Sequence, residues 1–205
     1  MKKQLLTGAL AAATLTVTSV IQADPAQALS FNFAGPFEVN PSISSQGGID
    51  VTASATATSG PERVVVQTSA GLGVRLPRSL DSFQIDGLGP DETLNLHFSE
   101  RVNLLSATFG RVGFGDEFRL LVDGTRFIDA NIPGGNRSDT DFGFFSFSPS
   151  PTGSLFGFTV TDKKDDYYLK AVHVTPVPAP AAVLPGLFGM GMAAFRKKRQ
   201  ADEVA

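Results

Sequence analysis

The chain of 205 residues contains no cysteine and no tryptophan, and only two histidines and two tyrosines. Without cysteine it has no disulfides, no thiolate catalysis and no zinc–thiolate site, so an exported domain of this sequence depends on its packed core. Two histidines, His97 and His173, are too few for a metal centre built from several imidazoles. Exposed tryptophan and tyrosine are the usual platforms for sugar rings, so such a platform would have to use Tyr167 and Tyr168.

Positive charge is scarce in the central part of the chain, residues 29–174. Of the 17 Lys/Arg, two precede this part and four follow it, whereas of the 20 Asp/Glu only Asp24, Asp202 and Glu203 lie outside it. The central part therefore holds 11 basic and 17 acidic residues, a net charge near −6. An excess of this sign argues against nucleic acid as a partner.

The N-terminus has the features of a signal peptide over residues 1–28. Lys2 and Lys3 precede an apolar stretch, and Ala26 and Ala28 are the small residues expected on the N-terminal side of a signal cleavage site. This pattern predicts an exported protein whose mature form begins near Leu29.

The C-terminus combines a short apolar segment with a cluster of basic residues. Residues 181–195 form an uncharged run, which is shorter than the roughly 18 to 20 residues that span a bilayer comfortably as a helix. A basic stop follows the run and would keep the C-terminus on the cytoplasmic side, leaving the body outside; it consists of Arg196, Lys197, Lys198 and Arg199. We expect residues 181–205 to be a membrane and sorting segment, joined to the body by a proline-rich linker over 175–180.

The order of proline motif, short apolar segment and basic end resembles the PEP-CTERM class of bacterial sorting signals, in the proline-alanine variant typical of cyanobacteria. The motif residues are Val177, Pro178, Ala179, Pro180, Pro185 and Gly186. The resemblance implies recognition by an exosortase-type membrane enzyme, cleavage near the prolines, and delivery to the cell surface or extracellular matrix. The sequence departs from the usual pattern in two ways: Ala179 replaces the glutamate of Pro-Glu-Pro, and six residues follow Arg199. The alternative is a plain C-terminal anchor.

Hydrophobic residues in the body alternate with a period of two, which predicts β-strands with one buried face. The expected strands cover 31–39, 49–57, 63–68, 93–98, 102–109, 118–122, 142–147, 156–160 and 167–174. No helix-length amphipathic segment occurs between them. One domain of short strands separated by turn residues indicates an antiparallel β-sandwich of jelly-roll type. Fifteen of the 17 phenylalanines lie in this body, and we expect them to fill the space between the sheets.

Two loops carry enough polar residues to be considered as sites. The first contains four carboxylates within twelve residues that could bind calcium, although their spacing is not that of an EF-hand; they are Asp81, Asp86, Asp91 and Glu92. Together with the rest of 70–125, this loop resembles a module found in PEP-CTERM cargo, which implies no known activity. The second loop, 129–141, is rich in Asp, Asn and Gly. Both also fit ordinary solvated turns, and a turn is the interpretation we favour.

Catalysis finds little support, because no Gly-x-Ser-x-Gly pattern occurs and both histidines are placed on strands. Three functional classes follow. The leading one is a non-catalytic surface or matrix protein, embedded in extracellular polysaccharide. The second is a carbohydrate-binding module, with calcium as a candidate cofactor. The third is a polysaccharide hydrolase with paired carboxylates.

Overall fold

The computed structural model describes residues 27–78 and 82–178. Several residues named above lie outside these ranges: Ala26, Asp81, the motif residues Ala179, Pro180, Pro185 and Gly186, and the basic stop 196–199. The predicted signal peptide and C-terminal membrane segment therefore stay predictions. Within the described ranges, no helix is long and apolar enough to cross a membrane.

The described part of the chain is all-β and antiparallel, which confirms the predicted class. Its strands are β1 (Leu29–Asn32), β2 (Glu38–Val39), β3 (Val51–Ala57), β4 (Val64–Thr68), β5 (Gly71–Arg75), β6 (Ile85–Asp86), β7 (Glu92–Val112), β8 (Glu117–Val122), β9 (Thr125–Asn131), β10 (Asp141–Ser146), β11 (Thr152–Val160) and β12 (Asp166–Pro176). No helix interrupts them.

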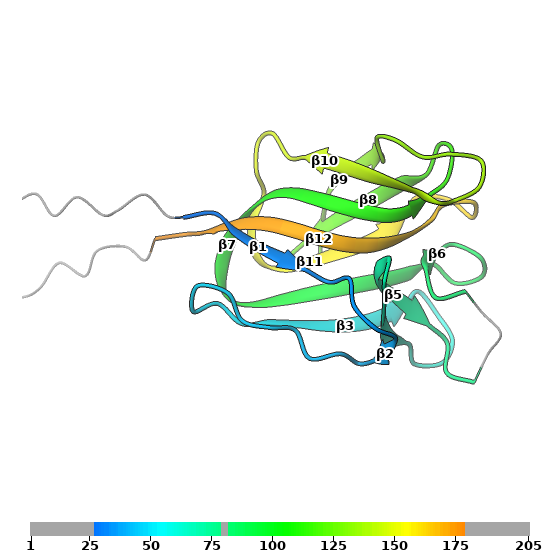
Figure 1. The fold of residues 1–205 in the computed structure, drawn as a ribbon, viewed down its shortest axis with the longest axis horizontal. Coiled ribbons are helices and arrows are strands. Elements are labelled where there is room, and N and C mark those ends of the chain that lie inside the picture. The colour runs from blue at the N-terminus through cyan, green and yellow to red at the C-terminus, as the bar shows by residue number, and fades with distance from the viewer. Residues whose placement is uncertain (1–26, 79–81, 179–205) are drawn as a thin grey trace, which may run out of the picture.

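The strand β7 joins two layers, because its two halves pair with different neighbours. Its first half pairs with β3 and β11, and β11 continues through β8 to β9. Its second half pairs with β10 and β12, and β12 continues to β1, β5 and β6. Between the halves the strand bends (Figure 1). The result is a sandwich whose layers share one long strand.

Sequence reasoning placed two strands where β7 is continuous, and it missed β5, β6 and β9. In β5, a side chain at Gly73 would collide with the Phe83 carbonyl oxygen, 1.7 Å from the position of its Cβ. The glycine therefore allows close contact between two backbones. The predicted loop 129–141 also needs correction, because its first three residues belong to β9.

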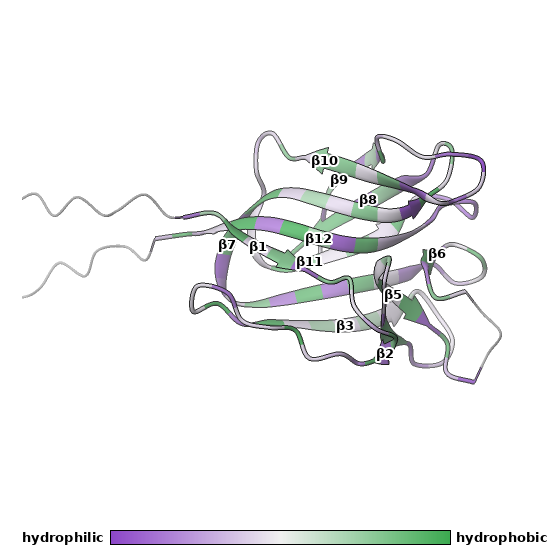
Figure 2. Ribbon diagram, in the orientation of Figure 1, coloured by the Kyte–Doolittle hydropathy of each residue, from purple (hydrophilic) through white to green (hydrophobic). Residues whose placement is uncertain are grey.

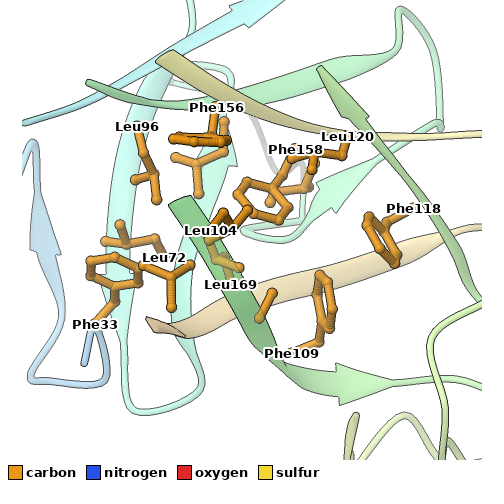
Figure 3. Packing of buried hydrophobic residues seen from close by; sticks show 14 of the residues in the cluster. Phe33, Leu72, Leu96, Leu104, Phe109, Phe118, Leu120, Phe156, Phe158 and Leu169 are labelled. Atoms are coloured by element: carbon orange, nitrogen blue, oxygen red, sulfur yellow. The ribbon is translucent and has the colours of Figure 1, made fainter. Parts of the chain in front are cut away.

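The core lies between the layers and combines phenylalanine with leucine and valine (Figure 3). The Phe109 ring is 4.9 Å from the Phe118 ring and 5.2 Å from the Tyr167 ring, measured between centroids. The Tyr167 hydroxyl donates to the Thr159 carbonyl oxygen at 2.8 Å, so this buried tyrosine keeps a hydrogen-bond partner. The prediction that phenylalanine fills the core is confirmed for these rings, but it is wrong for five others. The exposed phenylalanines are Phe37, Phe114, Phe127, Phe142 and Phe144.

The two ends of the described chain lie side by side. In the pairing of β1 with β12, Leu29 is opposite Val174, and beyond β12 the Val177 amide donates to the Arg101 carbonyl oxygen at 3.0 Å. Both ends leave the domain where β7 bends, which we call the terminal end (Figure 1). The loops β7–β8, β9–β10 and β11–β12 lie at the other end, the distal end.

Candidate functional site

The carboxylates considered as calcium ligands are engaged in separate local contacts. Glu92 is buried and accepts a 2.7 Å hydrogen bond from the guanidinium of Arg63, which is also buried. Asp86 is buried as well, and accepts from the Ser82 hydroxyl at 2.5 Å and the Leu88 amide at 3.0 Å. Across residues 27–78 and 82–178, no group of three or more acidic, histidine or cysteine side chains is suited to hold a metal ion. Asp91 is half-buried, and Asp81 lies outside the described residues.

A different set of carboxylates gathers at the distal end. Burial raises the pKa of Asp116 to about 6, and the nearby charges of other aspartates add to the rise. The pKa of Asp166 is raised to about 6 by burial and by the charges of Asp139, Asp86 and Asp165, although the Gln84 side-chain amide donates to it at 2.6 Å. The set is Asp86, Asp116, Asp139, Asp165 and Asp166.

Hydrogen bonds to loop amides explain why several of these carboxylates lie close together. The Asp116 carboxylate accepts from the Gly113 amide at 2.5 Å and so closes the β7–β8 loop. Asp165 accepts from the Thr161 and Asp162 amides and from the Glu117 amide, at 2.8 to 3.1 Å, and so ties the β11–β12 loop to β8. In the turn 162–166, Asp165 is therefore buried, because it caps these amides.

The acidic second loop and the histidines also have structural roles. Asp129 lies in β9, and its carboxylate accepts hydrogen bonds from the guanidinium groups of Arg119 and Arg126. The bond from Arg119 lowers the pKa of Asp129. His97 is exposed on β7, as predicted, and contacts the Ser54 hydroxyl at 3.4 Å. His173 is half-buried on β12.

Neither tyrosine can serve as a sugar platform. Tyr167 is fully buried and Tyr168 is only 4% exposed. The route to sugar binding that the sequence suggested through these two rings is therefore wrong.

Two of the exposed rings, Phe142 and Phe144, lie instead on the outer face of the layer formed by β10, β7, β12 and β1, which we call the β10 face. β10 is an edge strand in the described structure and carries hydrophobic positions along its length (Figures 1 and 2). Phe142 and Phe144 point the same way, since they are two residues apart, and are 54% and 53% exposed. The intervening Gly143 is buried.

A lysine from another strand reaches one of these rings. The ammonium of Lys170 lies 3.6 Å from the centroid of the Phe142 ring, within the range of a cation–π contact. Lys170 belongs to β12, two strands away, and sits where the register with β7 shifts between Leu169 and Ala171. Phe142 is paired with Gly110 of β7, and Gly110 is paired in turn with Tyr168, two residues before Lys170.

Two open hollows flank the rings on this face. One is lined by the β4–β5 turn and the strand ends around Phe142: Ser69, Ala70, Arg111, Thr140 and Phe142. The other is lined by Ala28, Leu105, Ser106, Phe144, Ser146 and His173. Each hollow therefore combines one exposed ring with hydroxyl groups and a nitrogen-bearing side chain. Sequence reasoning missed this face because β10 has phenylalanine on both sides, so alternation did not reveal which rings turn outward.

The fold and these sites define an all-β antiparallel sandwich domain. No family model matches the chain, and no curated protein matches it. Among solved structures it is similar to a GH26-CBM35 β-(1,4)-mannanase of Podospora anserina, with 12% identity and a TM-score of 0.34 over 75% of this chain and 29% of that one. It is also similar to the family 32 carbohydrate-binding module of Clostridium perfringens NanJ, solved with galactose, with 10% identity and a TM-score of 0.30 over 61% of this chain and 92% of that one.

A third similar structure is CBM32-3 from a family 31 glycoside hydrolase of C. perfringens. It has 13% identity and a TM-score of 0.29, over 49% of this chain and 71% of that one. The chain thus spans less than a third of the mannanase and most of the two isolated modules. Likenesses this distant do not identify a ligand.

Proposed function

We propose that the chain is an exported, non-catalytic β-sandwich protein of the cell surface or extracellular matrix, sorted through its PEP-CTERM-like tail by an exosortase-type enzyme. The observation that carries this proposal is the pairing of the first and last strands, β1 and β12. An N-terminal signal and a C-terminal membrane segment both act at the same membrane. A domain whose two ends emerge together can stay tethered there by either end while its other surfaces face away.

The distal end and the β10 face would then be available to the surroundings. At the distal end, the carboxylates of Asp86, Asp116 and Asp165 accept hydrogen bonds from backbone amides, which supports a structural role for them. This favours a binding or matrix function over hydrolysis by paired carboxylates.

The test is the intact mass of the protein from its native host, measured separately for medium, surface extract and membrane fractions. A species beginning near Leu29 and ending near Pro178, found outside the membrane, is the expected result. An intact C-terminus retained in the membrane would replace exosortase sorting with a plain anchor. A species that keeps residues 1–28 inside the cell would overturn export itself.

Two tail variants sharpen the result. Replacing both Pro178 and Pro180 with alanine should leave the tail uncleaved, because the resemblance places recognition in the proline motif. The control replaces Lys163 with glutamine on the exposed β11–β12 loop and should be processed normally.

A further inference from the structure

We propose that the β10 face binds an acidic polysaccharide, with the exposed phenylalanine rings stacking on sugar rings and Lys170 pairing with a sugar carboxylate. This inference rests on the proposed function, since it names a partner for a domain placed at the cell surface. It assigns the partner to a strand face rather than to either of the two polar loops considered from the sequence.

Exposure of the rings is the first step of the argument. Replacing large apolar side chains on a solvent-exposed sheet face with polar ones costs the protein no folding stability. Keeping them adds a risk of unwanted association with other molecules. Phe144 lines an open hollow together with Ser106, Ser146 and His173. An aromatic ring beside several hydrogen-bonding groups suits a pyranose ring, which has an apolar C–H face and a rim of hydroxyls.

The charge of this face differs from that of the rest of the domain. The strand segments that form it are 29–32 of β1, 103–111 of β7, 142–146 of β10 and 170–176 of β12. Within these segments there is no Asp or Glu, whereas Arg111, Lys170 and His173 are present; the one acidic residue of β10 is Asp141, the half-buried residue before Phe142. In a body with a net charge near −6, the β10 face is therefore a local surface for an anionic partner.

The position of Lys170 makes this complementarity specific. Its ammonium rests on the Phe142 ring and thus lies among the exposed aromatic side chains instead of extending into solvent. A carboxylate-bearing sugar stacked on this face would bring its charge close to the ammonium. A neutral polysaccharide could not form an ion pair with Lys170. A polyanion without sugar rings could not stack on Phe144.

The test measures the dissociation constant of the full-length protein for oligogalacturonate by isothermal titration calorimetry. Methyl-esterified oligogalacturonate keeps the sugar chain but removes its charge, and polyglutamate keeps the charge but has no sugar ring. We expect oligogalacturonate to bind at least about tenfold more tightly than either comparison ligand, because each of those ligands lacks one of the two contacts. Equal binding of polyglutamate, or no binding of oligogalacturonate, would overturn the proposal.

Matched variants locate the site. Phe144→Ala should weaken binding about tenfold, and Lys170→Gln should weaken it and also reduce its dependence on salt. The controls are Phe114→Ala, which removes an exposed ring at the distal end, and Lys163→Gln, which removes an exposed lysine. If the controls weaken binding as much as the face variants do, the assignment is wrong. Fractionation of the host decides the proposed function separately, because a protein delivered to the surface that binds no acidic glycan would contradict only this inference.

Discussion

Phenylalanine occupies two contrasting regions of this domain. Between the layers, Phe118 and Phe158 are fully buried and belong to one continuous core. On the β10 face, Phe142 and Phe144 expose about half of their surface, at 54% and 53%. The same residue type thus stabilises the fold in one region and is available for binding in the other. What separates the two roles is the side of the strand on which each ring lies.

The largest effect should come from removing a ring of the interior. Phe118 contacts the Phe109, Phe145, Phe147 and Phe158 rings. We expect Phe118→Ala to lower the free energy of unfolding by about 3–5 kcal/mol, through lost transfer energy and the cavity left behind. Chemical denaturation monitored by far-UV circular dichroism measures this change. A loss below about 1 kcal/mol would mean that the layers do not pack as described.

Breaking a buried ion pair should cost more stability than breaking an exposed one, as removing a buried ring does. The Arg63–Glu92 pair has side chains only 4% and 2% exposed, whereas the Arg101–Asp123 pair, at 3.6 Å, is 59% and 42% exposed. Arg63→Ala would leave the Glu92 carboxylate buried without this partner, so we expect a loss of about 3 kcal/mol. Arg101→Ala, the matched control, should cost less than about 1 kcal/mol. Similar losses in the two denaturation curves would contradict the buried location of the first pair.

The distal aspartates predict how stability changes with pH. The pKa of Asp116 and of Asp166 is about 6 in the folded protein, against an ordinary value of 3.8 for this side chain, so between these values the folded state holds protons that the unfolded state has released. Their contribution is therefore fully present below about pH 4 and is lost as the pH rises through 6. We expect the domain to be about 1–2 kcal/mol more stable at pH 5 than at pH 7.

Asp116→Asn should reduce this pH dependence, because it removes one of the two titrating groups. Glu100→Gln, which changes an exposed carboxylate at the terminal end, should leave the dependence as it is. Denaturation curves recorded for both variants at pH 5 and pH 7 provide the comparison. A wild-type protein that is more stable at pH 7 than at pH 5 would show that the aspartates are not buried together.

The smallest effect is expected on the β10 face. Phe144→Ala should change the free energy of unfolding by less than about 0.5 kcal/mol, because the ring is half exposed and lies outside the core. Thermal denaturation of Phe144→Ala and of Phe118→Ala, measured under the same conditions, compares the two losses of stability directly. The two variants make the same substitution and differ only in where the ring lies. A large loss for Phe144→Ala would make the face part of the stabilising structure rather than a binding surface.

The sequence allowed the fold class to be predicted because alternation is clear where one face of a strand is buried. In β11, Phe156, Phe158 and Val160 face the core, as their spacing indicates. The short β6 could not be found, since two residues that pair with Asp166 and Tyr167 show no period. Its presence depends on partners about 80 positions away in the chain.

The candidate site on the β10 face could not be predicted from the sequence for a different reason. In β10 both sides of the strand carry phenylalanine, so the pattern is compatible with either side facing the core. The pairing of Phe142 with Gly110 and of Phe144 with Thr108 fixes the orientation, and it comes from β7, more than 30 residues earlier. The contact with Lys170 likewise depends on the position of β12.

The most direct test of the contrast between these two regions is chemical-shift mapping by NMR during titration with oligogalacturonate. The account predicts that the perturbed signals cluster on the β10 face, at Phe142, Phe144, Lys170 and His173, while those of Phe118 and the distal aspartates stay unchanged. Perturbations centred on the distal loops, or none at saturating oligosaccharide, would contradict it.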